Sequence, residues 1–164
     1  MAEEPRSDKL KTEVVQKIYE SSQELIYGAD RKVAALLLIN AILISFSATW
    51  NLKEYSSSIK IIIMVAVLLA ALSTILYLLA IIPRISEQAP KSILHYKGIL
   101  GSSRENYVSK MTEMSDDDLM KDYLYTIYSL SSIQRKKNLF LRRGSESLII
   151  SISLLALSFV LNNL

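Results

Sequence analysis

Three long apolar runs alternate with polar segments along the chain. The first covers residues 33–50, the second residues 61–82 and the third residues 145–164. The first two would measure about 27 Å and about 33 Å as helices, close to the roughly 30 Å hydrocarbon core of a bilayer. Serines interrupt the third run, so a buried or interfacial helix is the alternative interpretation there. The pattern predicts an all-α membrane protein with three transmembrane helices and a small cytoplasmic helical region.

The distribution of lysine and arginine predicts the orientation of these helices. Six such residues precede the first run, two (Lys53 and Lys60) lie in and beside the first connection, and eleven lie between the second and third runs. Because basic residues concentrate on the cytoplasmic side, residues 1–32 and 83–144 are predicted to be cytoplasmic and residues 51–60 a short periplasmic loop. The formal net charge of +3 then reflects topology, and no nucleic-acid partner is predicted.

Small side chains within the first two runs suggest close helix packing. Small residues let backbones approach, which is a main source of packing energy in lipid. Asn40 is the polar exception in the first run, and it predicts either an interhelical hydrogen bond or a pore-lining, gating role. The small residues are Ala34, Ala35, Ala41, Ser45 and Ala48 in the first run, and Ala66, Ala70, Ala71 and Ser73 in the second.

Two polar segments have helical periodicity. In the N-terminal segment the apolar positions predict an amphipathic helix, which either breaks at Gly28 or runs on into the first span. A second helix is predicted from Ser115, whose hydroxyl would cap it, with Gly144 as a kink before the third span. The predicted faces are Leu10, Val14, Ile18, Ser21 or Ser22, and Leu25 on the first helix, and Leu119, Tyr123, Ile127, Leu130, Ile133, and Phe140 or Leu141 on the second.

Composition argues against enzyme chemistry. The chain has no cysteine, one histidine and four glycines. Thiol nucleophiles, disulfides and histidine-rich metal centres are therefore excluded, and no glycine-rich phosphate-binding loop is present. Asp116, Asp117 and Asp118 follow Ser115 and are interpreted as a helix start, not as a metal site. The sequence predicts a protein that is not an enzyme and has no metal or cofactor.

An ordered set of short motifs resembles a known family. The chain resembles the transmembrane effector family of the Pycsar bacterial antiphage systems over roughly residues 20 to 164. Arg31 and Thr126 depart from the pattern, which expects a small or polar residue and a glutamine at these positions. The motifs are Ala29-Asp30-x-Lys32, Asn40, Pro83-Arg84, Ile93-Leu94-His95-Tyr96-Lys97-Gly98-Ile99, Asn106-Tyr107-Val108, and Asp122-Tyr123-Leu124 with Ile127-Tyr128, Leu130-Ser131, Ile133, Lys136-Lys137 and Leu141-Arg142.

The resemblance implies a role in antiviral defence. Such an effector responds to a cyclic pyrimidine nucleotide, cCMP or cUMP, that a companion pyrimidine cyclase makes on phage infection. It then impairs the bacterial inner membrane and leads to abortive infection. The implied partners are the lipid bilayer, the cyclic mononucleotide and further copies in a homo-oligomer, and residues 83–144 would be the sensor region.

A receptor for a cyclic mononucleotide needs a cation for the phosphate and an aromatic surface for the base. For each candidate the ordinary alternative is lipid contact or packing at a core edge. The phosphate candidates are Arg84, Lys97, Arg135 and Lys136, and the stacking candidates are His95, Tyr96, Tyr107, Tyr123 and Tyr128.

Nucleotide binding would favour an oligomer or a helix tilt in which the third span and Asn40 line a water-admitting defect. The alternative function is a small structural or adaptor membrane protein that docks a cytoplasmic partner. A transporter or channel subunit is disfavoured, because no ionisable residue lies in the middle of a predicted span.

Overall fold

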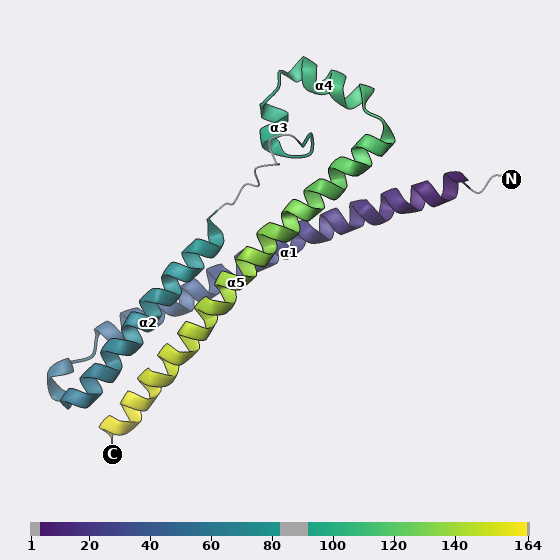
Figure 1. The fold of residues 1–164 in the computed structure, drawn as a ribbon. Helices are drawn as coiled ribbons and strands as arrows, with labels where there is room; N and C mark the ends of the chain where they lie inside the picture. The colour runs from purple at the N-terminus through teal and green to yellow at the C-terminus, as the bar shows by residue number, and fades with distance from the viewer. Residues whose placement is uncertain (1–3, 83–91, 164) are drawn as a thin grey trace. The chain divides into compact units, whose positions relative to one another are not determined.

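The computed structural model of the chain describes residues 4–82 and 92–163 and is helical, with no strand in these ranges (Figure 1). Long helices account for most of it, and short ones lie in the two connections. The elements are α1 (Glu4–Ala48), the 3₁₀ turn η1 (Leu52–Glu54), α2 (Ser57–Ile81), α3 (Tyr96–Leu100), α4 (Arg104–Glu113) and α5 (Asp116–Asn162).

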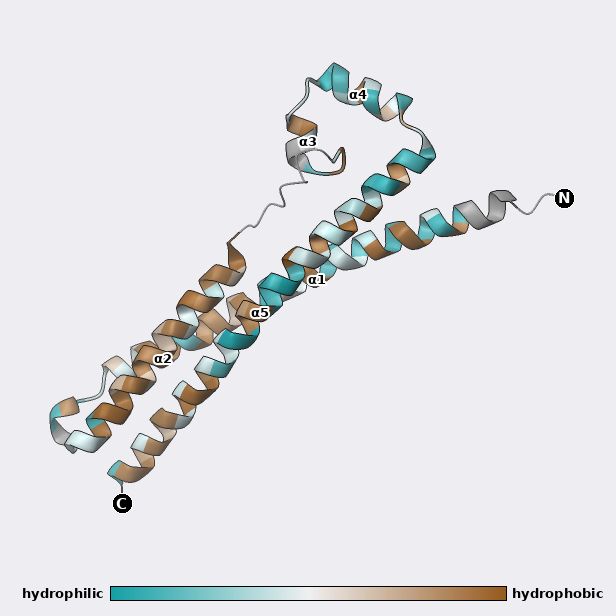
Figure 2. Ribbon diagram, in the orientation of Figure 1, coloured by the Kyte–Doolittle hydropathy of each residue, from teal (hydrophilic) through white to brown (hydrophobic). Residues whose placement is uncertain are grey.

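Three of these helices are long and apolar enough to cross a membrane, namely α1, α2 and α5. Figure 2 shows α2 hydrophobic along almost its whole length, whereas α1 and α5 are each mixed in one part and hydrophobic in the other. The predicted all-α membrane protein with three membrane-spanning helices is therefore confirmed.

The first and third apolar runs form parts of longer helices. Residues 33–48 are the last part of α1, and α5 continues from Asp116 through Gly144 to Asn162. Of the two alternatives at Gly28, the helix runs on. A glycine inside a helix costs only about 1 kcal/mol relative to alanine, which is too little to interrupt so long a helix.

The chain divides into two compact units, which we describe separately. The head unit comprises the described residues of 1–27 and 83–135. The span unit comprises Gly28–Ile82 and the described residues of 136–164. Helices α1 and α5 each contribute residues to both units.

Serine hydroxyls cap three helices. Ser56 accepts from the Ile59 amide at the start of α2, and Ser103 accepts from the Asn106 amide at the start of α4. Ser115 accepts from the Asp118 amide at 3.2 Å, so the cap predicted at the start of α5 is confirmed. These caps satisfy amides that have no partner within the helix.

The predicted packing face of the N-terminal helix is wrong. Its apolar residues, Leu10, Val14, Ile18 and Leu25, are between 46% and 62% exposed. The neighbouring stripe of the head unit is half-buried or buried instead. It consists of Val15, Tyr19, Ser22 and Ile26, of which Ser22 was among the predicted positions. This stripe follows alternating steps of four and three residues, the 3.5-residue repeat of helices packed side by side. On α5 the predicted face is half-buried, as expected.

Candidate functional site

The three helices of the span unit pack through regularly spaced positions. Buried residues on α2 recur at steps of four and three, which is the spacing of knobs-into-holes packing. The same spacing separates Gly144, Leu148, Ser151, Leu155 and Ser158 on α5. The buried α2 residues are Ile59, Ile63, Ala66, Ala70, Ser73, Tyr77 and Ala80.

Polar side chains occupy many of these buried positions. We call them the polar seam: Asn40 and Ser47 of α1, Ser73 of α2, and Ser147, Ser151 and Ser158 of α5. The exposed faces of the same helices carry large apolar residues such as Ile42, Leu68 and Phe159. The interior of the span unit thus combines polar side chains with buried apolar ones such as Val33, Ile63 and Leu148, and its outer faces are apolar, as expected where lipid replaces water around them.

The small residues of α1 are not at its helix contacts, contrary to prediction. Ala34, Ala35, Ala41, Ser45 and Ala48 are all exposed. The helix instead buries Val33, Asn40 and Ser47, because these residues are seven positions apart and therefore lie on the packed face. On α2 the prediction holds for Ala66, Ala70 and Ser73 and fails for Ala71, which is exposed.

Three serine hydroxyls of the seam cross between α2 and α5. Each donates to a backbone carbonyl of the other helix, although that carbonyl already accepts a helix hydrogen bond. Hydrogen bonds of this type join helices in a membrane. The pairs, each 2.8 Å apart, are Ser73 Oγ with Gly144 O, Ser147 Oγ with Leu69 O, and Ser151 Oγ with Ala66 O.

Asn40 joins α1 to α2 and leaves one of its own atoms without a partner. Its Nδ2 donates to Ala70 O and to Thr74 Oγ1, both at 2.8 Å. A carbonyl only accepts, so Nδ2 must face Ala70 and the amide orientation is fixed. Its Oδ1 is buried and has no hydrogen-bond partner among the described residues. Asn40 makes the predicted interhelical bond, and its gating role stays a prediction.

Gly144 permits a close approach of α5 to α2. A Cβ at this position would lie 2.6 Å from the ring of Tyr77, which is fully buried. The Tyr77 hydroxyl and Ser145 Oγ lie 3.3 Å apart in a hydrogen bond. The glycine therefore serves as the surface on which an aromatic ring lies, and the helix continues through it.

One ion pair joins α1 to α5 within the span unit. Lys137 Nζ donates to Asp30 Oδ1 in a short contact. The Lys137 side chain is 8% exposed and that of Asp30 38%. A nearly buried ammonium needs such a partner, because desolvation without one is costly. The pair therefore holds these two helices together at one end of the seam.

In the head unit, Asp122 of α5 fixes the segment before α3. Its Oδ2 accepts from Ser92 Oγ and from the Ile93 amide, both at 3.0 Å. Ser92 Oγ also lies 3.1 Å from Thr126 Oγ1, in a buried hydrogen bond. We call this set of contacts the head-unit anchor. Thr126, which departs from the family pattern, takes part in it, and the anchor positions the backbone that leads to His95.

Two tyrosines pack α1 against α5 in the head unit. The rings of Tyr19 and Tyr123 meet edge to face, with centroids 5.4 Å apart and an interplanar angle of 85°. Burial raises the pKa of Tyr19, and the neighbouring Tyr123 raises it further. Both effects disfavour a phenolate in this contact, so Tyr19 acts as a neutral packing residue.

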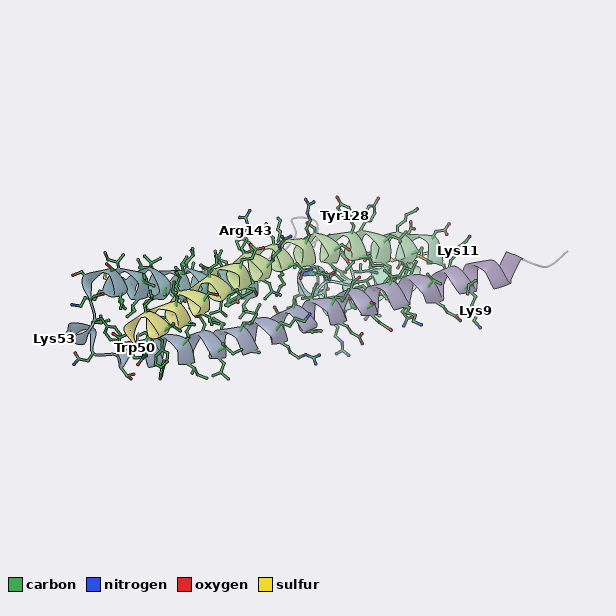
Figure 3. The ribbon with its side chains drawn as sticks, turned by 90° about the horizontal axis from the view of Figure 1, so that it is seen from below. Lys9, Lys11, Trp50, Lys53, Tyr128 and Arg143 are labelled. Atoms are coloured by element: carbon green, nitrogen blue, oxygen red, sulfur yellow. The ribbon has the colours of Figure 1, made fainter. Side chains whose placement is uncertain are left out.

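The predicted ligand residues are dispersed over the head unit and its border. Tyr123 lies on the packed face of α5, whereas Tyr128 is 74% exposed and Arg135 and Lys136 are exposed. Figure 3 shows Tyr128 projecting outward from α5. Tyr107 of α4 and His95 are half-buried. Arg84 lies outside the described residues, as do the side chains of Tyr96 and Lys97, whose backbones belong to α3.

Sequence reasoning missed Lys137, Asp30 and Asp122 as individual sites. All three stood within the quoted motifs, but nothing distinguished Lys137 from the adjacent Lys136. A count of seven residues back from Gly144 places Lys137 on the buried face of α5. That spacing is the signal that could have found it.

Comparison with known proteins identifies the family. A search of curated proteins and a search of solved structures each found no match. The family model described as the Pycsar effector protein domain matches residues 14–162, which include the head-unit anchor, α1 from residue 14 onward, and the whole of α2 and α5. The chain therefore belongs to the Pycsar effector family, and it is a membrane protein of antiphage defence.

Proposed function

We propose that this effector senses a cyclic pyrimidine nucleotide, cCMP or cUMP, in the cytoplasm and then impairs the inner membrane, leading to abortive infection. A companion pyrimidine cyclase supplies the nucleotide. Membership of the Pycsar effector family supports the proposal. The 17-to-2 bias of lysine and arginine supports an N-terminus and a head unit on the cytoplasmic side.

The observation that carries this proposal is the continuity of two helices. Both α1 and α5 contribute residues to the head unit and to the span unit without a break. A ligand that binds the head unit more tightly in one arrangement of these helices also selects an arrangement of the spans. The head unit is thus the sensor, and the span unit is the part that acts on the bilayer.

Exposed residues of α5 offer the chemistry that a cyclic mononucleotide requires. We place the base on Tyr128 and the phosphate at Arg135, which is seven residues away and so on the same face of the helix. Lys136 adds positive charge beside Arg135. From the other connection, Arg84, His95, Tyr96, Lys97 and Tyr107 are further candidates, and Tyr123 positions α5 through its contact with Tyr19.

Permeation is the proposed output, with Asn40 as its gating residue. The unpartnered Oδ1 of Asn40 supports this role, because water admitted to the span unit would supply the missing donor. We further propose that several copies assemble in the active state, since the described residues of one chain provide three spans.

Liposome leakage tests the proposal. The protein reconstituted in liposomes should release K⁺ when cCMP or cUMP is added and should not respond to cAMP or cGMP. Equal leakage with and without every nucleotide would refute sensing. A protein that binds cUMP without any leakage would refute the membrane output.

Matched variants test the binding face. Tyr128→Ala and Arg135→Gln should each weaken nucleotide binding at least tenfold, because stacking and charge-assisted phosphate contacts are lost. Tyr125→Ala and Lys121→Gln remove an exposed tyrosine and an exposed lysine from the same helix and should leave binding unchanged. Equal losses in both sets would place the site elsewhere.

The adaptor function remains the second candidate, because an unpartnered apolar stripe favours it. Leu10, Val14, Ile18 and Leu25 are exposed on α1 of the head unit, and an apolar stripe of this kind suits a protein partner. If the chain is an adaptor, it co-purifies with a larger complex and its expression causes no growth arrest. If it is an effector, expression with the cyclase arrests growth on phage infection.

A further inference from the structure

The polar seam extends along about half of the thickness of a bilayer. On α5 it runs from Ser147 to Ser158, a separation of 11 residues, or about 17 Å of helix. The hydrocarbon core of a membrane is roughly 30 Å thick. Asn40 and Ser47 of α1 and Ser73 of α2 are buried as well, so each of the three helices contributes polar side chains to the inner side of the span unit.

In the packed arrangement these polar groups are satisfied by protein, with one exception. The seam hydroxyls donate to backbone carbonyls, including Ser47 to Leu43 O and Ser158 to Leu155 O within their own helices. Asn40 Oδ1 has neither a protein partner nor contact with solvent. An unpartnered buried acceptor is costly, so parting the helices with entry of water removes a penalty that the packed state carries.

The outer faces of the span unit have no comparable lining. Large aliphatic and aromatic side chains cover them, as at Leu38, Leu72 and Ile152. Exposed hydroxyls occur singly, as at Ser45 of α1 and Ser153 of α5, and Ser153 Oγ bonds within its own helix. Intact bundles that assembled side by side would enclose an apolar surface, which water does not fill readily.

We infer that the water path of the open state is lined by the polar seam, exposed when the three spans part, and not by the outer faces of intact bundles. The inference rests on the proposed function, because it assumes that the protein permeabilises a membrane. Its ligands are water and small monovalent ions. Lys137, the buried charged residue among those described in the span unit, is paired with Asp30, so no net charge lies on the path and it discriminates weakly between K⁺ and Cl⁻.

The absence of cysteine from the chain makes a direct test possible. Ser47→Cys and Ser151→Cys place a thiol in the seam on α1 and α5. Ser45→Cys and Ser153→Cys place one two residues away on the exposed face of the same helices. A cationic methanethiosulfonate reagent is added to proteoliposomes during leakage. Leakage through the seam variants should fall at least fivefold, whereas leakage through the two outer-face variants should not change.

The outcomes separate this inference from the proposed function. Block through the outer-face cysteines alone overturns the inference and leaves nucleotide-triggered leakage intact. Leakage that ignores cCMP and cUMP but is blocked through the seam cysteines overturns the trigger and supports the inference. Liposomes that never leak, with seam thiols that stay unmodified, overturn both.

A second variant guards against loss of folding. Asn40→Leu replaces the carboxamide by an apolar side chain of similar size and so removes the unpartnered acceptor. It should fold with unchanged helicity and slow the nucleotide-triggered leakage about tenfold, while nucleotide binding stays the same. Wild-type leakage rates in a folded Asn40→Leu protein would contradict the inference.

Discussion

The head unit and the span unit differ in the side chains that α1 and α5 pack. Tyrosine rings meet in the head unit, whereas serines and Asn40 lie among buried apolar side chains in the span unit. In the head unit the packed residues of α1 and α5 include Val15, Tyr19 and Tyr123, and the exposed surface is mixed. In the span unit the packed residues include Asn40 and Ser151, and the exposed surface is aliphatic. Water drives apolar groups inward in the first case, whereas lipid makes small and polar groups the adhesive in the second.

The comparison teaches that the burial pattern, not the residue type, is continuous along these helices. Steps of four and three residues mark the packed face both before and after the border between the units. Whether water or lipid surrounds the helices then determines which residue types are stable on that face. Substitutions should therefore affect one unit and not the other. The positions to test are the ion pair, the glycine contact, the head-unit anchor and the α5 cap.

The largest effect is expected at the ion pair of the span unit. Asp30→Ala leaves the Lys137 ammonium nearly buried without its carboxylate and should cost about 3 kcal/mol of stability. Thermal unfolding in detergent micelles measures the loss. Glu146→Ala removes one partner of the exposed Arg142–Glu146 pair and should cost less than about 0.5 kcal/mol. Adding Lys137→Met to Asp30→Ala should restore most of the loss, and failure to do so would show that Asp30 acts through other contacts.

The next effect contrasts the two glycines. Gly144→Ala drives a methyl group against the Tyr77 ring and should destabilise the span unit by about 2 kcal/mol. Gly28→Ala meets nothing within 4 Å and should stabilise α1 by up to about 1 kcal/mol. Unfolding temperatures of the two variants should therefore shift in opposite directions. Shifts of the same sign would mean that the approach of α5 to α2 relaxes freely.

A smaller and local effect is expected in the head unit. Asp122→Ala removes the acceptor of the Ser92 hydroxyl and the Ile93 amide, at a cost of about 1–2 kcal/mol. Hydrogen exchange should accelerate in α3 and the residues before it and remain unchanged in α2. Asp122→Asn keeps an oxygen acceptor and should have a weaker effect. Faster exchange throughout α2 would contradict the independence of the two units.

The smallest effect concerns pH and the start of α5. The Ser115 hydroxyl, and after it Lys121, hold the pKa of Asp118 below its ordinary value of 3.8. A lowered folded-state pKa gives stability that is present above the ordinary value and is lost as the pH falls through the lowered one. The protection of the first-turn amides of α5 from exchange, relative to an unstructured chain at the same pH, should therefore fall in acid below about pH 4. Ser115→Ala should raise exchange at all pH values and flatten this response, whereas Asp117→Asn should retain it.

The sequence predicted the membrane-spanning helices well because most of their surface faces lipid. Runs such as 61–82 are apolar on all sides apart from a few hydroxyl side chains such as Ser73 and Thr74, so their mean composition carries the signal. The orientation of each helix about its axis was harder. Ala34 and Ala41 are small enough to be contact residues, yet Val33 and Asn40 occupy the packed face of the helix.

The candidate site was predictable in part. Asn40 was found because an amide among aliphatic residues is conspicuous, and its bond to Ala70 follows from that chemistry. Lys137 was not found, since neighbouring lysines look alike in sequence and differ only in which face of the helix carries them. Asp122 and Ser92 meet across 30 positions, which short-range patterns do not detect.

Because Gly144 has no side chain, the residue types allowed at positions 144 and 77 depend on each other. The Tyr77 ring occupies the space where any larger residue at 144 would begin, and the Gly144 carbonyl accepts from Ser73 on the same helix as that ring. Relatives that carry alanine or serine at 144 should therefore have a smaller residue at 77. Substitutions at the two sites should appear together across the family, and either one alone should be rare.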